Sequence, residues 1–346
     1  MDWHELLPNL SVLMLAGAAF AFYVASRLGV WALQSRIDPA GQQDVGPATL
    51  AQWLPVATVA TLALRDAPEV SVSIIFASSV ACLTLVPGTS FFAAPPVEAL
   101  DSRHRRAWGM LLPAAVLTLL AGFAAQFTLM HAAVMALQGI AALTLWMTSA
   151  PRELPTNPHP SAPQVSPSVG AGFRLLALAV WLALTFIGAW VAMRAANRMT
   201  HEVNRLTGAM IAAVMIAPAA ALPMIGSSLD WARQGRTGSA VSCATGCALL
   251  NLCVLLPVMI LNWQLIGAWQ RSGPQSLVHG EWLATPERPL PFPMAVWRID
   301  TVLLVVVGAM LLVFSTGRRW IPGRFEGFVL LVMYAAYMWA NGYVGR

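Results

Sequence analysis

An acidic pair, Asp66 and Glu69, lies inside an otherwise apolar stretch of the chain. If the stretch is helical, residues three apart share one face, so both carboxylates could bind or relay one cation. Arg65 stands beside them and leaves a local charge of roughly −1, whereas calcium prefers about six to eight oxygens with carboxylates balancing its charge. The pattern therefore favours a monovalent ion, a proton or no transport at all. The alternative is an ion cluster of these three side chains that only holds the helix in shape.

Two prolines inside apolar stretches, Pro68 and Pro223, are expected to break helices, because proline removes a backbone hydrogen bond. A serine follows each proline five residues later, as Ser73 and Ser228. These hydroxyls could supply oxygens to a cation, or they could bond back to their own helix. Asn251 presents the same choice between binding a cation and joining two helices.

Two other groups of polar side chains have simpler interpretations. Cys243 and Cys247, four residues apart, could bind a soft metal such as Cu(I), but we expect small side chains that pack between helices. Asp230 is expected to form an ion pair with Arg233 at a helix end. No set of nucleophile, base and metal ligands indicates an enzyme, and no cofactor is expected.

The composition indicates an integral membrane protein. Of the 346 residues, 58% are hydrophobic and 10% are charged, against about 25% charged residues in soluble domains. A membrane-spanning helix needs about 20 mainly apolar residues, and such stretches recur along the chain. The net charge of +5 comes from arginines at the ends of these stretches. That distribution is typical of membrane loops, so nucleic acid is not expected as a partner.

The apolar stretches predict an all-α membrane protein of about ten transmembrane helices, in two inverted five-helix repeats. The first repeat is residues 1–149, a Pro- and Ser-rich cytoplasmic linker is residues 150–172, and the second repeat is residues 173–346. The expected spans are residues 8–30, 48–79 with an interruption at Pro68, 80–94, 107–125, 127–147, 173–195, 206–232, 239–266, 295–314 and 325–343.

Arginines are more numerous in the loops on the side away from the N-terminus. The positive-inside rule then places both termini outside, with the linker in the cytoplasm. The acidic N-terminus does not match a signal peptide, so the first apolar stretch is expected to remain as a span. We expect the membrane to be a bacterial inner (plasma) membrane.

The second half resembles the cation/calcium exchanger superfamily, the membrane region of sodium/calcium exchangers. The resemblance rests on residues 205–213 leading into Leu222 and Pro223, on residues 232–237 with Gly246 and Asn251, and on the tail at residues 324–331. It implies a transporter fold of two inverted repeats that moves an inorganic cation by alternating access. It also implies a G-T-S-x-P-E pattern in each repeat, whose two glutamates bind the cation with neighbouring hydroxyls and amides.

Carried onto this sequence, the pattern is only partly kept. Pro68 and Glu69 retain its P-E in the first half, while Met224 follows Pro223 in the second. The predicted cation-binding (metal) residues are Glu69 and Asp66, with Ser73, Ser228 and Asn251 as neutral ligands and Arg65 modulating the charge. The alternative is a non-transporting relative, a membrane sensor or scaffold that kept the fold and lost the cation site.

Overall fold

The computed structural model of the protein describes residues 3–33, 45–93, 102–124, 126–148, 171–202, 207–272, 288–291, 294–316 and 321–344. The described residues are nearly all helical. Their helices are α1 (Trp3–Leu33), α2 (Val45–Asp66), α3 (Pro68–Leu83), α4 (Leu85–Ala93), α5 (Ser102–Gly122), α6 (Leu129–Thr148), α7 (Ala171–Glu202), α8 (Gly208–Ile211), α9 (Ala217–Arg233), α10 (Thr237–Leu250), α11 (Leu256–Ser272), α13 (Met294–Thr316) and α14 (Arg324–Val344). Strands β1 (Gln126–Phe127) and β2 (Leu290–Pro291) pair antiparallel.

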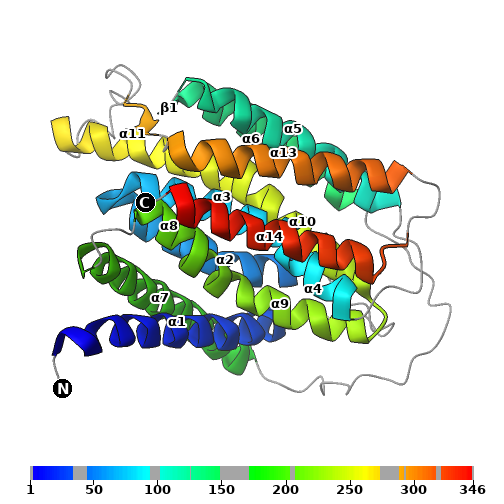
Figure 1. The fold of residues 1–346 in the computed structure, drawn as a ribbon, viewed down its shortest axis with the longest axis horizontal. Coiled ribbons are helices and arrows are strands. Elements are labelled where there is room, and N and C mark those ends of the chain that lie inside the picture. The colour runs from blue at the N-terminus through cyan, green and yellow to red at the C-terminus, as the bar shows by residue number, and fades with distance from the viewer. Residues whose placement is uncertain are drawn as a thin grey trace.

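The helices run roughly parallel or antiparallel in one bundle (Figure 1). The long helices α1 and α7 lie side by side along one edge, and α5, α6 and α13 lie along the opposite edge. Helices α2, α3, α9 and α10 fill the space between these edges. Helix α1 begins and α14 ends at the same end of the bundle, as an even number of spans requires.

The outer surface of the bundle is apolar, which is typical of a protein surrounded by lipid. Six helical stretches have the length and composition to cross a membrane, at Leu10–Leu33, Val45–Asp66, Pro68–Ala93, Gly172–Thr200, Ala212–Arg233 and Thr237–Gln270. Large apolar side chains on the outer helices are exposed, including Phe20, Leu137, Leu175, Val313 and Trp339. The chain is therefore an integral membrane protein, as its composition predicts.

The expectation of one long, kinked helix over residues 48–79 is wrong. Helix α2 ends at Asp66 and a separate helix, α3, begins at Pro68. Proline is favourable at the first helical position, where its missing N–H has no partner to lose, and Glu69 in the first turn suits the positive helix end. Helix α3 continues through Thr84 into α4, so the expected short span at residues 80–94 is largely the second part of this buried rod.

Two helices widen locally into a π-helical turn. The turn η1 (Ala212–Ile216) connects α8 to α9, and η2 (Asn251–Leu255) connects α10 to α11. Such turns are rare in proteins as a whole, and those that occur are often found at functional sites. The second one begins at Asn251, a predicted cation ligand.

Helices α4 and α14 cross in direct backbone contact. A Cβ atom built on Gly327 of α14 would lie 2.6 Å from the backbone nitrogen of Phe92 and 2.9 Å from the backbone oxygen of Gly88. Small residues permit this approach, as at other membrane helix crossings. The contact fixes α14 against the buried rod of α3 and α4.

The predicted linker at residues 150–172 lies outside the described residues, except that Ala171 and Gly172 already belong to α7. In the second half, the expected loop after residue 266 begins later, because α11 continues to Ser272.

Candidate functional site

A hydrogen-bonded polar group lies where α2, α3 and the α10–η2 junction meet. The indole Nε1 of Trp53 donates to Oδ1 of Asn251 at 3.0 Å, and Nδ2 of Asn251 donates to Oγ of Ser78 at 3.0 Å. Asn251 and Ser78 are buried. An asparagine in this position joins three helices, and both ends of its amide have a partner.

Gln52 and Cys243 extend this group toward the middle of α2 and α10. The thiol of Cys243 donates to Oε1 of Gln52 at 3.1 Å, and both side chains are buried. Trp53, Asn251, Ser78, Gln52 and Cys243 are called the central polar cluster below. The second cysteine, Cys247, donates to the backbone oxygen of Thr49 at 3.5 Å.

The central polar cluster contains no formal charge. Its members are amides, a hydroxyl, an indole and a thiol, and the described residues hold no group of three His, Cys, Asp or Glu side chains that could bind a metal ion. Cys243 and Cys247 are both buried and donate hydrogen bonds to α2. Three buried polar atoms on α2, α9 and α10 have no hydrogen-bond partner, namely Nε2 of Gln52, Oγ of Ser228 and Oγ1 of Thr237.

The structure places the predicted acidic pair elsewhere. Arg65, Asp66 and Glu69 are exposed at the turn between α2 and α3, so these charges do not lie in the middle of a span. Exposure removes the desolvation penalty that a mid-membrane cluster would have to overcome. The physical reason is the helix end at Asp66, which brings the charged segment to the end of the bundle.

The two prolines also do not meet. Val70, in the first turn of α3, lies against Gly208 at the start of α8, whereas Pro223 follows Gly208 by fifteen residues. At 1.5 Å per residue, that offset is about 20 Å along the bundle. The expected break at Pro223 is absent as well, since α9 continues through it and the irregular turn is η1, before α9 begins.

The predicted neutral ligands have different surroundings. The hydroxyl of Ser73 donates to the backbone oxygen of Glu69 at 2.7 Å, so it bonds back to its own helix. Ser228 is buried with its hydroxyl unpartnered. Asn251 is the predicted ligand that lies in the central polar cluster.

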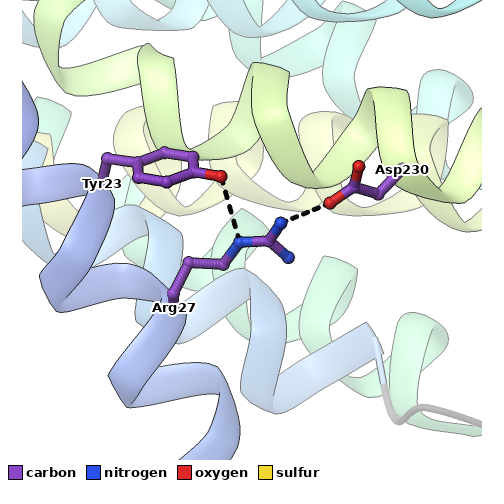
Figure 2. Close-up of polar contacts among 3 residues, drawn as sticks. All are labelled: Tyr23, Arg27 and Asp230. Atoms are coloured by element: carbon purple, nitrogen blue, oxygen red, sulfur yellow. Dashed lines mark hydrogen bonds and ion pairs between the residues drawn. The ribbon is translucent and has the colours of Figure 1, made fainter.

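Asp230 forms an ion pair, but its partner is Arg27 of α1 and not the expected Arg233 (Figure 2). The Nε of Arg27 also donates to the hydroxyl of Tyr23 at 3.4 Å. The side chains of Arg27 and Asp230 are 49% and 37% exposed. The pair connects α1 to α9 near the end of both helices, and sequence neighbours gave no sign of it.

Breaking this pair is expected to have a small effect. Exposed ion pairs typically contribute about 0.2–1 kcal/mol, so Arg27→Ala and Asp230→Asn should each lower the melting temperature only slightly. A double-mutant cycle measured by thermal unfolding isolates the pair, because the double variant should lose less than the sum of the single variants. Strictly additive losses would show that the pair contributes nothing.

One buried carboxylate was not predicted. Asp300 of α13 is 0% exposed, and neither of its oxygens has a hydrogen-bond partner. Tyr337 and Asn341 of α14 lie beside it. The sequence could have indicated it, because an ionisable residue within an apolar span is by default a candidate functional residue.

Comparison with known proteins agrees with this architecture. Residues 174–343 match the family described as "Sodium/calcium exchanger protein". The sodium-calcium exchanger NCX_Mj superposes with a TM-score of 0.62 at 16% identity, covering 95% of this chain and 97% of that one. YfkE gives 0.68 at 15% identity, covering 96% and 92%, and the H+/Ca2+ exchanger CAX gives 0.64 at 12% identity, covering 97% and 88%. The search of curated proteins finds no match.

The fold and the buried polar cluster define a helical membrane protein with the exchanger fold. Residues 174–343 match the sodium/calcium exchanger family, and the chain has the fold of these exchangers, which confirms the resemblance to the cation/calcium exchanger superfamily.

Proposed function

We propose that the protein is a secondary active transporter that moves an inorganic cation across the membrane by alternating access. The observation that carries this proposal is the exchanger fold with a buried polar cluster at its central helix crossing. We further propose that residues 1–149 and 173–346 are inverted five-helix repeats joined by residues 150–172. Both termini would lie outside a bacterial inner membrane.

The proposed repeats share one internal proline on comparable helices. Pro55 lies inside α2 and Pro223 inside α9, each preceded by leucine. Each of these helices is followed by a largely buried helix, α3 or α10. This comparison makes Pro55, and not Pro68, the counterpart of Pro223. The residues at the family's glutamate positions are then Val56 and Met224, which are both buried and uncharged.

The charge of the centre bears on the choice of ion. Calcium binds through carboxylates and about six to eight oxygens, and both proposed glutamate positions carry apolar side chains. A neutral cluster of amide and hydroxyl oxygens places less demand on a monovalent ion. We therefore propose sodium or a proton as the cargo in preference to calcium.

Flux through purified protein in proteoliposomes tests the location of the site. Gln52→Ala removes the buried amide oxygen Oε1, the atom of Gln52 that could bind a cation, and losing an interaction with a charged species costs about 1.5–3 kcal/mol. Sodium or proton flux should fall by about ten- to a hundredfold, since about 1.4 kcal/mol corresponds to tenfold.

Glu69→Gln and Asp66→Asn are the matched controls, and flux should stay within about twofold of the wild type, because exposed substitutions have small effects. Loss of flux in Glu69→Gln with normal flux in Gln52→Ala would move the site back to the α2–α3 turn. Melting temperatures measured in parallel identify any variant that fails by unfolding.

A second candidate is a non-transporting relative that kept the fold. The observation in its favour is that most polar groups of the central polar cluster already bond to one another, as Asn251 does to Trp53 and Ser78. This candidate predicts no flux and no shift of the melting temperature with sodium, calcium or pH. An ion-dependent rise in melting temperature would argue against it.

A further inference from the structure

Asp300 is a buried acid in the apolar helix α13. It is the seventh residue of α13, about 9 Å from the start of that helix. Helix α13 packs against α3, α5 and α14, and α13 and α14 lie next to each other in Figure 1. Acidic residues at such depth are rare and mark ion or proton pathways.

The other charged side chains on α13 and α14 lie away from Asp300. Arg298 is exposed, and its position two residues earlier puts it on the opposite face of α13. The charged residues at the start of α14, Arg324 and Glu326, precede Tyr337 by more than ten residues, which is about 15 Å or more.

The helices α3 and α5 bring no counter-charge either. The backbone oxygen of Leu119 on α5 accepts a hydrogen bond from Trp297, which is close to Asp300 in sequence, so Leu119 marks the level of Asp300 along α5. Arg106 precedes Leu119 by thirteen residues, which is about 20 Å along the helix. On α3, Glu69 is exposed in the first turn and, being an acid, is no counter-charge for Asp300. Among the described residues, Asp300 therefore has no ionic partner.

An ionised carboxylate without a partner is strongly disfavoured in an apolar interior. Asp300 must therefore be neutralised by a proton or by a bound cation. The side chains beside Asp300 are Tyr337 and Asn341, which offer two oxygens where a calcium ion takes about six to eight. A proton requires only one acceptor.

The neighbouring side chains match a protonated carboxyl group. A protonated carboxyl has one donor as well as acceptors, whereas a carboxylate can only accept. Asn341 uses its Nδ2 to donate to the backbone oxygen of Tyr337 at 3.2 Å, which leaves its Oδ1 as an acceptor. The hydroxyl of Tyr337 is buried and has no partner, so it can donate to Asp300. One proton on Asp300 allows all three side chains to pair.

We propose that Asp300 is a proton-binding site, with Tyr337 and Asn341 as its hydrogen-bond partners, separate from the central polar cluster. Helix α13 packs directly against α3, the helix that carries Ser78 of the central polar cluster. The role of Asp300 in coupling proton movement to cation movement rests on the proposed transport function, but proton binding does not.

The titratable groups around Asp300 decide how the test is read. Tyr337 faces it from α14, Tyr334 lies next to Tyr337 with ring centroids 5.8 Å apart, and Cys82 of α3 lies near Tyr334. None of these is a carboxylic acid. A carboxyl C=O vibration therefore separates Asp300 from its neighbours.

Infrared difference spectroscopy of the full-length protein in liposomes, titrated from acid to alkaline pH, tests the proposal. The wild type should show a protonated-carboxyl C=O band that is lost on alkalinisation. The band should be absent in Asp300→Asn and retained in the exposed-site controls Glu69→Gln and Asp66→Asn. A wild type without the band, or a band that persists in Asp300→Asn, would overturn the proposal.

Tyr337→Phe covers the case in which Asp300→Asn does not fold. It keeps the acid and removes one hydrogen bond, so the band should shift in frequency and remain. An unshifted band would overturn the assignment of Tyr337 as partner. Flux assays separate the two proposals. A band without any flux would support proton binding at Asp300 and contradict the transport function. Flux without the band would support the transport function and contradict proton binding at Asp300.

Discussion

Replacing Gly327 by alanine is expected to destabilise the protein by about 1–3 kcal/mol, the usual range for overpacking. The added methyl group would lie 2.6 Å from the Phe92 backbone nitrogen and 2.9 Å from the Gly88 oxygen. Backbone atoms cannot move aside as a flexible side chain can, so α14 must shift away from α4. Thermal unfolding of the purified protein, followed by tryptophan fluorescence, measures the loss.

Gly342→Ala on the same helix is the control. A Cβ atom there meets only the end of the Met210 side chain at 3.7 Å, an ordinary contact. Alanine is also the better helix former, so the melting temperature should stay the same or rise slightly. If the two variants shift the melting temperature in the same direction and by the same amount, the close crossing of α4 and α14 does not stabilise the fold.

Replacing Asn251 by leucine is expected to lower stability by about 1–3 kcal/mol, the penalty for leaving buried polar groups unpaired. The substitution keeps the approximate volume but removes the acceptor of the Trp53 indole and the donor to Ser78. The exposed Asn197 of α7 provides the control, and Asn197→Leu should change the melting temperature far less.

A second substitution identifies the cause. Trp53→Phe removes the indole N–H, so in its presence Asn251→Leu leaves one fewer unpaired donor and should cost less than it does alone. Equal costs in both backgrounds would mean that the bond between α2 and η2 contributes nothing.

Most helices could be predicted from the sequence, because long apolar stretches bounded by arginine, proline or glycine define them. The expected spans at residues 295–314 and 325–343 correspond closely to α13 (Met294–Thr316) and α14 (Arg324–Val344). The break at Pro68 was predicted, but as an interruption within one span and not as the start of a separate helix, although the segment carries the signals of a helix start, with proline at the first position and an acid in the first turn. The apolar residues on both sides outweighed the three charged residues Arg65, Asp66 and Glu69.

The central polar cluster could not be predicted in the same way. Trp53 and Asn251 are 198 residues apart in the chain, and nothing local in either segment indicates that they meet. The family pattern directed attention to Glu69 because Glu69 follows Pro68. Pro68 starts a helix, whereas Pro55 lies inside α2 and is followed by valine. Asp300 was readable from its place in an apolar span, but no pattern linked it to Tyr337.

The π-helical turn η2 holds one residue more than an ordinary α-helical turn would. At 3.6 residues per turn, one extra residue rotates everything that follows by about 100°. The face that α11 turns toward α6 therefore depends on this local widening. The widened turn is equivalent to the insertion of one residue into an α-helix. Shortening the turn by one residue would redirect the whole of α11, including Gln264, whose Oε1 accepts from the backbone N–H of Arg288 at 2.6 Å.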